Sequence, residues 1–343
     1  MEIKSNIYFK IGQPSTGKSF GFAYENLKDN DFFTDFNETQ YKLIPVSGGI
    51  GNEYKGLQNT DLAISYDVIN ETLKLGDFLK MLMLAIKNPE KQYVVFLDDF
   101  HNQDISSLLS EYTPLFKAQQ KVDLTNFVKA ENTQDLDVEK FDSTSDFIDK
   151  WNVFIETLRK KDGVSIVPIT NRLSGEDIKL VYPANFYLFG AANFNEKTVN
   201  IFADWADRAY IESIDPIKLM KDFKKIKEIN DNDFVDCVVK INEELQMILE
   251  EHGIYDYEKY CFGIWKLVDE KGNVETDDKK QKKLIIFLLG MIKNALIYNN
   301  KNSLINEIGT ELLTHMKDDK FFKLTDTELE DKKTLHKYGI YES

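Results

Sequence analysis

Short apolar runs that end in polar residues recur through the first two thirds of the chain. They lie at residues 7–11, 41–46, 93–97 and 182–193. Runs of this length are typical of buried strands in a parallel sheet. Between them, residues 73–86 and 147–161 repeat apolar side chains every three or four positions, which predicts amphipathic helices. Strands that alternate with helices predict an α/β fold around a central, mostly parallel sheet.

The pattern changes at Asp215-Pro216, after which a helical period dominates. It fills residues 217–229, 233–251, 257–268, 279–298 and 302–316. Because proline cannot continue a regular element, this point is a natural boundary. The pattern predicts an α/β domain over residues 1–215, an all-α domain over 216–325 and an extended or partly helical tail over 326–343. Within the first domain, the polar and acidic stretch 117–149 favours a solvated insertion with a mobile portion or a partner-facing loop.

One segment carries a motif with a definite chemistry. It reads Gly12-Gln13-Pro14-Ser15-Thr16-Gly17-Lys18-Ser19, which fits G-x-x-x-x-G-K-[ST], and Phe20 opens a helix expected to run to about residue 27. A glycine-bearing loop between a strand and a helix N-terminus presents backbone N–H groups to phosphate. Lys18 would reach the β- and γ-phosphates, and the Ser19 hydroxyl would bind Mg²⁺. The alternative is a chance turn rich in small residues.

Polar residues at the ends of two later strands extend this candidate site. Asp98 and Asp99 directly follow the apolar run 93–97, and Asn193 ends the run 182–193. Asp98 would hold Mg²⁺ through its water shell, and Asp99 would polarise the attacking water. The Asn193 amide would sense the γ-phosphate and orient that water. An ordinary acidic turn is the alternative for the two aspartates.

The chain contains few arginines, so few side chains are candidates for a further catalytic group with a permanent positive charge. The chain contains only Arg159, Arg172 and Arg208. A group that stabilises the transition state of phosphoryl transfer needs a planar, permanently charged donor. Arg208, just before a short apolar segment, is our candidate. A surface ion pair with Asp204 or Asp207 is the alternative.

The charge of the chain limits its partners. Its 343 residues carry Lys+Arg 43 against Asp+Glu 58, a net charge of −15 at pH 7. Long-range attraction to nucleic acid or to an anionic membrane is therefore not expected, and direct DNA binding by the isolated chain is disfavoured. The N-terminus lacks a signal-peptide core, and the apolar run 284–292 is too short to span a bilayer. We therefore expect a cytoplasmic protein with no membrane segment.

The sequence spacing of Cys237, Cys261, His252, His315 and His336 indicates no redox or metal site. Cys237 and Cys261 have no C-x-x-C spacing, so we expect reduced packing thiols. His252, His315 and His336 show no metal-ligand spacing, and no role is assigned to them.

Together the motifs resemble a known family. The segment 87–111 with its two aspartates, the segment 182–193 and the pair Asp207-Arg208 are similar to the McrB-type branch of AAA+ nucleotidases, near the MoxR-like and dynein-related members. The resemblance covers roughly residues 5–215. It extends weakly to Ile241-Asn242 and to residues 260–263.

The resemblance implies an αβα P-loop core with a helical lid, assembled into a homo-oligomeric ring, usually a hexamer, with nucleotide at subunit boundaries. The loop from Gly12 to Ser19 is then the phosphate loop, Asn193 the first sensor and Arg208 a finger that acts in trans. Asp98 and Asp99 form the second motif, in which Asp99 stands where the family has the longer Glu. No arginine exists in the lid for a second sensor.

These features predict a Mg²⁺-dependent nucleoside triphosphatase that uses ATP or GTP. Its expected role is that of a ring-forming motor that remodels or translocates a macromolecule for a partner protein carrying the specificity. The shorter acid and the missing lid arginine motivate an alternative, a nucleotide-gated assembly scaffold with little or no turnover.

Overall fold

The computed structural model divides the chain into two compact units. Unit 1 comprises residues 1–11 and 19–212, and unit 2 comprises residues 12–18 and 213–343. The structure describes residues 5–12, 18–19, 27, 38–46, 64–67, 72–100, 109–117, 121–129, 133–138, 145–159, 164–170, 177–193, 205, 207–226, 232–263 and 274–340.

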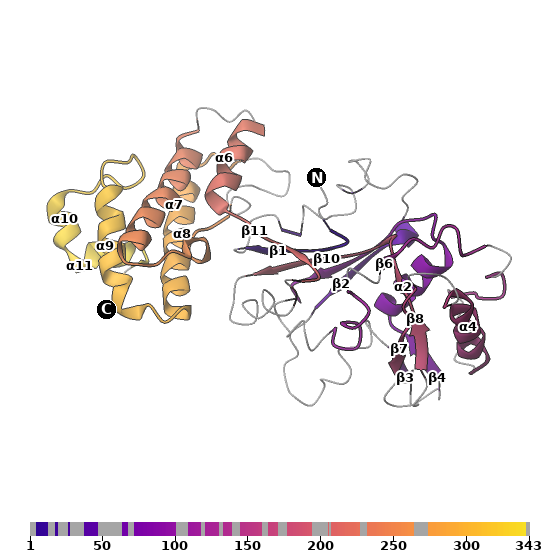
Figure 1. Ribbon diagram of the computed structural model, residues 1–343. Helices are drawn as coiled ribbons and strands as arrows, with labels where there is room; N and C mark the ends of the chain where they lie inside the picture. Colours follow the sequence, from indigo (N-terminus) through magenta and orange to yellow (C-terminus); the bar gives the residue numbers. More distant parts are fainter. Residues whose placement is uncertain are drawn as a thin grey trace. The chain divides into compact units, whose positions relative to one another are not determined.

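Unit 1 is built around a five-stranded sheet (Figure 1). Its strands are β1 (Ile7–Gly12), β2 (Tyr41–Pro45), β5 (Tyr93–Asp98), β10 (Phe186–Asn193) and β11 (Tyr210–Ser213), in the order β11-β1-β10-β5-β2. Both β10 and β2 pair with β5 in parallel. The apolar runs therefore form strands where the sequence predicts them, and the expectation of an α/β fold with a mostly parallel sheet is confirmed.

The interior strand β5 explains why these runs are continuously apolar. Tyr93, Val95 and Leu97 belong to the main buried cluster of unit 1. Val94 and Phe96 belong to a second cluster, which also contains Leu27. Because successive side chains of a strand point to opposite faces, the two clusters lie on the two faces of the sheet. A strand that is buried on both faces cannot alternate apolar with polar residues.

Helix α2 (Asp77–Lys87) supplies much of the main cluster, and its start corrects the predicted helix 73–86. Residues Thr72–Leu75 form strand β4, which pairs antiparallel with β3 (Ile64–Asp67). Gly76 is the N-cap, in an extended conformation, so the helix begins one residue later. Apolar periodicity alone does not show where a strand gives way to a helix.

The predicted strand 182–193 is divided by a buried asparagine. Tyr182–Pro183 form β9, and β10 starts at Phe186. Between them, Asn185 donates from Nδ2 to the carbonyl oxygens of Ala85 at 3.0 Å, Asn88 at 3.2 Å and Lys91 at 2.6 Å. Its own carbonyl oxygen accepts from the Tyr93 backbone N–H at 2.9 Å. This side chain thus holds the end of α2 at the starts of both β5 and β10.

The acidic stretch 117–149 is more tightly packed than its composition indicates. Between residues 121 and 138, five apolar side chains are buried in the main cluster: Val122, Leu124, Val128, Leu136 and Val138. Strand β6 (Lys121–Val122) pairs in parallel with β9, and helix α4 (Ser145–Leu158) begins inside the stretch. The expectation of a solvated insertion therefore does not hold for these residues, because their spaced apolar positions are sufficient to anchor them.

Helix α4 covers a small hairpin. Strands β7 (Val167–Thr170) and β8 (Asp177–Leu180) pair antiparallel. Trp151 and Phe154 of α4 are buried, as the helical period predicts, and Trp151 Nε1 donates to the Lys179 carbonyl oxygen at 2.8 Å. The Asn152 side chain also bonds to the backbone of Asp177 and Lys179.

Unit 2 has its own apolar core, and the regular elements that follow β11 in it are helices (Figure 1). Its helices are α6 (Pro216–Ile226), α7 (Asp233–Glu251), α8 (Asp278–Tyr298), α9 (Ile305–His315), α10 (Asp326–Glu330) and α11 (Lys332–Lys337), with 3-10 turns at Tyr257–Lys259 and Asn302–Leu304. The expected helix 257–268 is only a 3-10 turn at its start, and residues 264–268 lie outside the description. The expected tail is helical and packs on the core through buried Leu329 and Ile340.

A buried asparagine organises the interior of unit 2. Asn242 of α7 donates to the Phe262 carbonyl oxygen at 3.0 Å and accepts from the Phe262 N–H at 3.2 Å. These are two of the positions to which the family resemblance weakly extends. Cys237 and Cys261 are buried and form no disulfide, and burial raises the pKa of both thiols. Among the residues with assigned positions, no helix is both long and apolar enough to cross a bilayer.

Gly190 in the middle of β10 permits a close packing contact. A Cβ atom there would lie 2.7 Å from Phe100 Cδ1 and 3.0 Å from Phe9 Cδ1, and both rings are fully buried. We predict that Gly190→Ala lowers the free energy of unfolding by about 1–3 kcal/mol through overpacking. Chemical denaturation measures the change.

Gly290 in α8 is the matched control. An added Cβ there would meet its nearest atom at 4.0 Å, so Gly290→Ala should raise the free energy of unfolding by about 0.5–1 kcal/mol through helix propensity. Equal effects of the two substitutions would contradict the packing argument at Gly190.

Candidate functional site

The strand order of unit 1 places the candidate site at one edge of the sheet. The chain passes from β1 to β2 on one side, fills β5 and β10 between them, and then places β11 on the other side of β1. The connections therefore change direction between β1 and β10. In open α/β sheets, ligands bind beyond the carboxyl ends of the strands at such a point. Here those ends are Gly12 of β1, Asn193 of β10 and, on the next strand, Asp98 of β5.

The end of the glycine-bearing motif meets the end of β5. Ser19 Oγ donates to Asp98 Oδ1 at 2.7 Å, so the chain that leaves β1 at the start of the motif returns to this carboxylate at its end. Asp98 Oδ1 also accepts from the Asp99 backbone N–H at 3.1 Å. The Asp98 carbonyl oxygen accepts from the N–H of Val46, directly after β2, at 2.8 Å. The carboxylate and its backbone are thus both held in place.

Asp99 occupies a backbone conformation that L-residues rarely adopt. Its φ is 51°, in the left-handed region, and its side chain is exposed. The next residue, Phe100, is fully buried, with its ring centroid 5.1 Å from that of Phe9. The space above Gly190 therefore anchors Phe100, and the tight turn before it presents Asp99 outward. The sequence analysis did not predict this packing of Phe100. The available signal was Gly190, a glycine inside an apolar strand.

Asn193 lies close to the aspartates by strand register. Gly190 pairs with Leu97, so continuing the register by one residue sets Ala191 beside Asp98. Asn193 is two residues further on, and therefore on the same face of the sheet as Asp98. With strands about 4.8 Å apart and a rise of about 3.3 Å per residue, the Cα atoms of Asp98 and Asn193 are about 8 Å apart. The Asn193 side chain is half-buried.

Arg208 forms an ion pair within this chain. Its Nη1 atom lies 2.6 Å from Asp207 Oδ1, with the arginine side chain 17% and the aspartate side chain 70% exposed. The turn is held by backbone bonds to the carbonyl oxygen of Trp205, which is buried against Phe9. The pairing with Asp207 is the alternative that the sequence left open. Arg159 pairs with Glu156 of α4 at 3.3 Å, and Arg172 lies outside the described residues.

A polar contact joins the strand after Arg208 to the strand before the motif. The Tyr8 hydroxyl of β1 donates to Glu212 of β11, and Lys10 lies 3.8 Å from the same carboxylate. Burial raises the pKa of the Tyr8 phenol, and the hydrogen bond to Glu212 raises it further. Burial lowers the pKa of Lys10, against the opposing effect of the Glu212 charge. The phenol therefore keeps the proton with which it bonds β11 to β1.

Part of the predicted phosphate loop lies outside the description. This holds for Gln13, Pro14, Ser15, Thr16, Gly17 and Phe20. Lys18 is described, and its side chain is 6% exposed. A lysine with so little exposure is held in a defined position rather than extended into water.

The sequence was compared with protein-family models and with curated proteins. The sequence matches no protein-family model, and no curated protein gives a significant match. The function proposed below therefore rests on the residues and on their geometry.

The left-handed backbone at Asp99 predicts that the protein does not need this side chain for its stability. Asp99→Gly relieves the left-handed backbone at the cost of greater unfolded-state freedom, so the free energy of unfolding should stay unchanged or rise by up to about 1 kcal/mol. Lys323→Gly is the control, because Lys323 has the same kind of backbone, with φ 48°. Chemical denaturation compares the two. A loss above about 1 kcal/mol in Asp99→Gly alone would show that the carboxylate has a structural role.

Proposed function

We propose that the chain binds a Mg²⁺–nucleoside triphosphate, ATP or GTP, at the carboxyl edge of its sheet and hydrolyses it. The observation that carries the proposal is the hydrogen bond from Ser19 Oγ to Asp98 Oδ1. It joins the last residue of the G-x-x-x-x-G-K-[ST] motif to the acid at the end of the interior strand β5. A chance turn of small residues gives no reason for the two ends to meet.

The donor set fits Mg²⁺. A hydroxyl and a carboxylate are the hard oxygen donors that this ion prefers, and Mg²⁺ usually keeps several waters beside one or two protein ligands. Ser19 would bind the ion, and Asp98 would hold it through its water shell. When bound, Mg²⁺ neutralises charge on the β- and γ-phosphates. The ammonium group of Lys18 would add a further positive charge to the phosphates.

Two other residues would act on the nucleophile. Asp99 would orient and polarise the attacking water, since it is exposed directly beside Asp98. The amide of Asn193, on the same face of the neighbouring strand, would donate to the γ-phosphate or hold the water. Asp99 is one methylene shorter than Glu, so its carboxylate reaches less far and turnover should be slow.

Arg208 would act on the nucleotide of a neighbouring subunit. Its pair with Asp207 involves a carboxylate that is 70% exposed, and exposed ion pairs contribute about 0–1 kcal/mol. A hydrogen bond from a cation to a desolvated phosphate is stronger. An incoming triphosphate would therefore displace Asp207. The biological role we propose is that of a ring-forming AAA+ motor of the McrB- or MoxR-like kind, which remodels or translocates a macromolecule for a partner protein.

The first test is nucleotide hydrolysis. Purified chain with Mg²⁺-ATP or Mg²⁺-GTP should release phosphate, and Lys18→Ala and Asp98→Asn should each lower the rate by at least about 100-fold. Lys42→Ala is the control, because Lys42 pairs at the surface with Asp77 at 2.7 Å. Equal rates in all variants would refute the assignment of the site.

The second test addresses the arginine. Arg208→Ala should lose most turnover, and mixing it with Lys18→Ala chains should restore turnover that neither variant has alone, because each supplies the part that the other lacks. A mixture that stays inactive while both variants assemble would contradict action in trans. Nucleotide-dependent oligomers on a sizing column, with no product after hours, would instead support the scaffold.

A further inference from the structure

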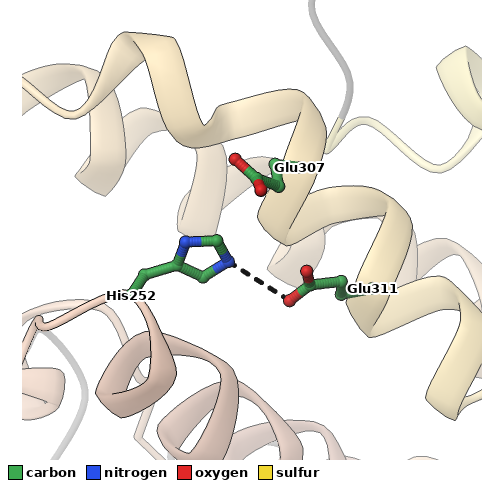
Figure 2. A group of neighbouring side chains, drawn as sticks. All are labelled: His252, Glu307 and Glu311. Atoms are coloured by element: carbon green, nitrogen blue, oxygen red, sulfur yellow. Dashed lines mark hydrogen bonds and ion pairs between the residues drawn. The ribbon is translucent and has the colours of Figure 1, made fainter.

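Three potential metal ligands gather in unit 2 and belong to none of the sequence motifs. They are His252, Glu307 and Glu311, and their ligand atoms all lie within 4.8 Å of one another (Figure 2). His252 Nε2 lies 3.3 Å from Glu311 Oε2. All three side chains belong to one compact unit, so their juxtaposition is set by the packing of its helices.

The end of α7 fixes the position of the histidine. His252 is the C-cap, and the chain then turns at Gly253, whose φ is 73°. The N–H of Gly253 bonds to Glu250 O at 3.0 Å and that of Ile254 to Leu249 O at 2.8 Å. These two bonds and the left-handed glycine form a Schellman motif. The ring is thus attached to a well-defined backbone beside the negative end of the helix dipole, which favours a cation.

The two carboxylates are one turn apart on α9. Glu307 and Glu311 are related as i and i+4 on the helix that also buries Ile308 and Leu312. Like charges at this spacing repel. No described hydrogen bond or ion pair involves Glu307, whereas Glu311 has only His252 among the described partners. A cation between the two carboxylates would remove the repulsion.

We propose that His252, Glu307 and Glu311 bind a divalent transition-metal ion, with Zn²⁺ the best fit. The imidazole nitrogen favours Zn²⁺ over Mg²⁺ and Ca²⁺, which prefer oxygen donors alone. In a tetrahedral Zn²⁺ site, bonds of about 2.0–2.2 Å place ligand atoms about 3.3–3.6 Å apart. The pair of His252 and Glu311 already has this separation, and Glu307 is exposed. Water would complete the coordination.

The alternative is a simple ion pair between His252 and Glu311. The chain contains a matched example of that arrangement between the same two helices. His315 Nδ1 of α9 lies 2.6 Å from Glu244 Oε2 of α7. Within the described residues no third ligand joins that pair. If a metal binds at the first cluster, the difference between the two pairs is Glu307.

A bound ion would link α7 to α9. His252 and Glu311 are 59 positions apart in sequence, so the ion would join segments separated by the whole of α8. Because a folded chain holds the ligands together and an unfolded chain does not, binding should raise the midpoint of thermal unfolding. This effect is independent of the nucleotide proposal.

The experiment is a Zn²⁺ titration of the untagged full-length chain. The protein is treated with chelator, desalted and titrated by calorimetry in a large excess of Mg²⁺, which occupies sites made of oxygen donors alone. The expected result is one Zn²⁺ bound per chain, with a higher unfolding midpoint. His252→Ala and Glu307→Gln should each weaken binding by at least about tenfold, and His315→Ala should bind as the wild type does.

Three results would overturn the proposal. They are no Zn²⁺ uptake by the wild type, unchanged affinity in Glu307→Gln, or an equal loss in His315→Ala. Should His252→Ala fail to fold, Glu307→Gln decides, because Glu307 is exposed and has no described partner. Co²⁺ as a substitute gives a second readout, since its absorption bands report nitrogen and oxygen ligation directly.

Discussion

The hydrogen bond between the Ser19 hydroxyl and the Asp98 carboxylate is the interaction on which the candidate site depends. Bonds to a charged group contribute about 1.5–3 kcal/mol, more than a neutral pair. Its larger effect is geometric. The segment that leaves the end of β1 is held by this bond at the end of β5. The strand between them, β10, then brings Asn193 to the same edge. Three segments far apart in sequence thus share one small region.

That edge can be precise because the sheet behind it is rigid. The apolar clusters on both faces prevent the strands from sliding, since a shift of one residue would turn every side chain to the wrong face. Asn185 adds a polar restraint at the opposite ends of β5 and β10, where it bonds to the end of α2. Towards the carboxyl ends of the strands, Phe100 fills the space above Gly190. The positions of the acids therefore follow from the packing of neighbouring aromatic and glycine residues.

The sequence predicts those parts of the fold that a local pattern determines. Strand β5 is predicted because residues 93–97 form a continuous apolar run, and α7 is predicted at residues 233–251 because its helical period is local. The parts of the fold that the sequence did not predict depend on partners far away in the chain. Residues 72–75 are a strand only because 64–67 pair with them. The acidic stretch near 121–138 is ordered because five apolar side chains find the core, which composition does not reveal.

The two candidate sites differ in the same way. The predicted phosphate loop is a contiguous motif, because wrapping a phosphate requires consecutive backbone N–H groups, and such a motif can be read from sequence. The cluster around His252 has no such requirement. A metal needs only ligand atoms at the right separation, and two helices that pack side by side can supply them from any register. The sequence around His252 therefore shows no metal-ligand spacing. The Schellman turn at Gly253 and the packing of α9 place its Nε2 atom 3.3 Å from the Glu311 carboxylate.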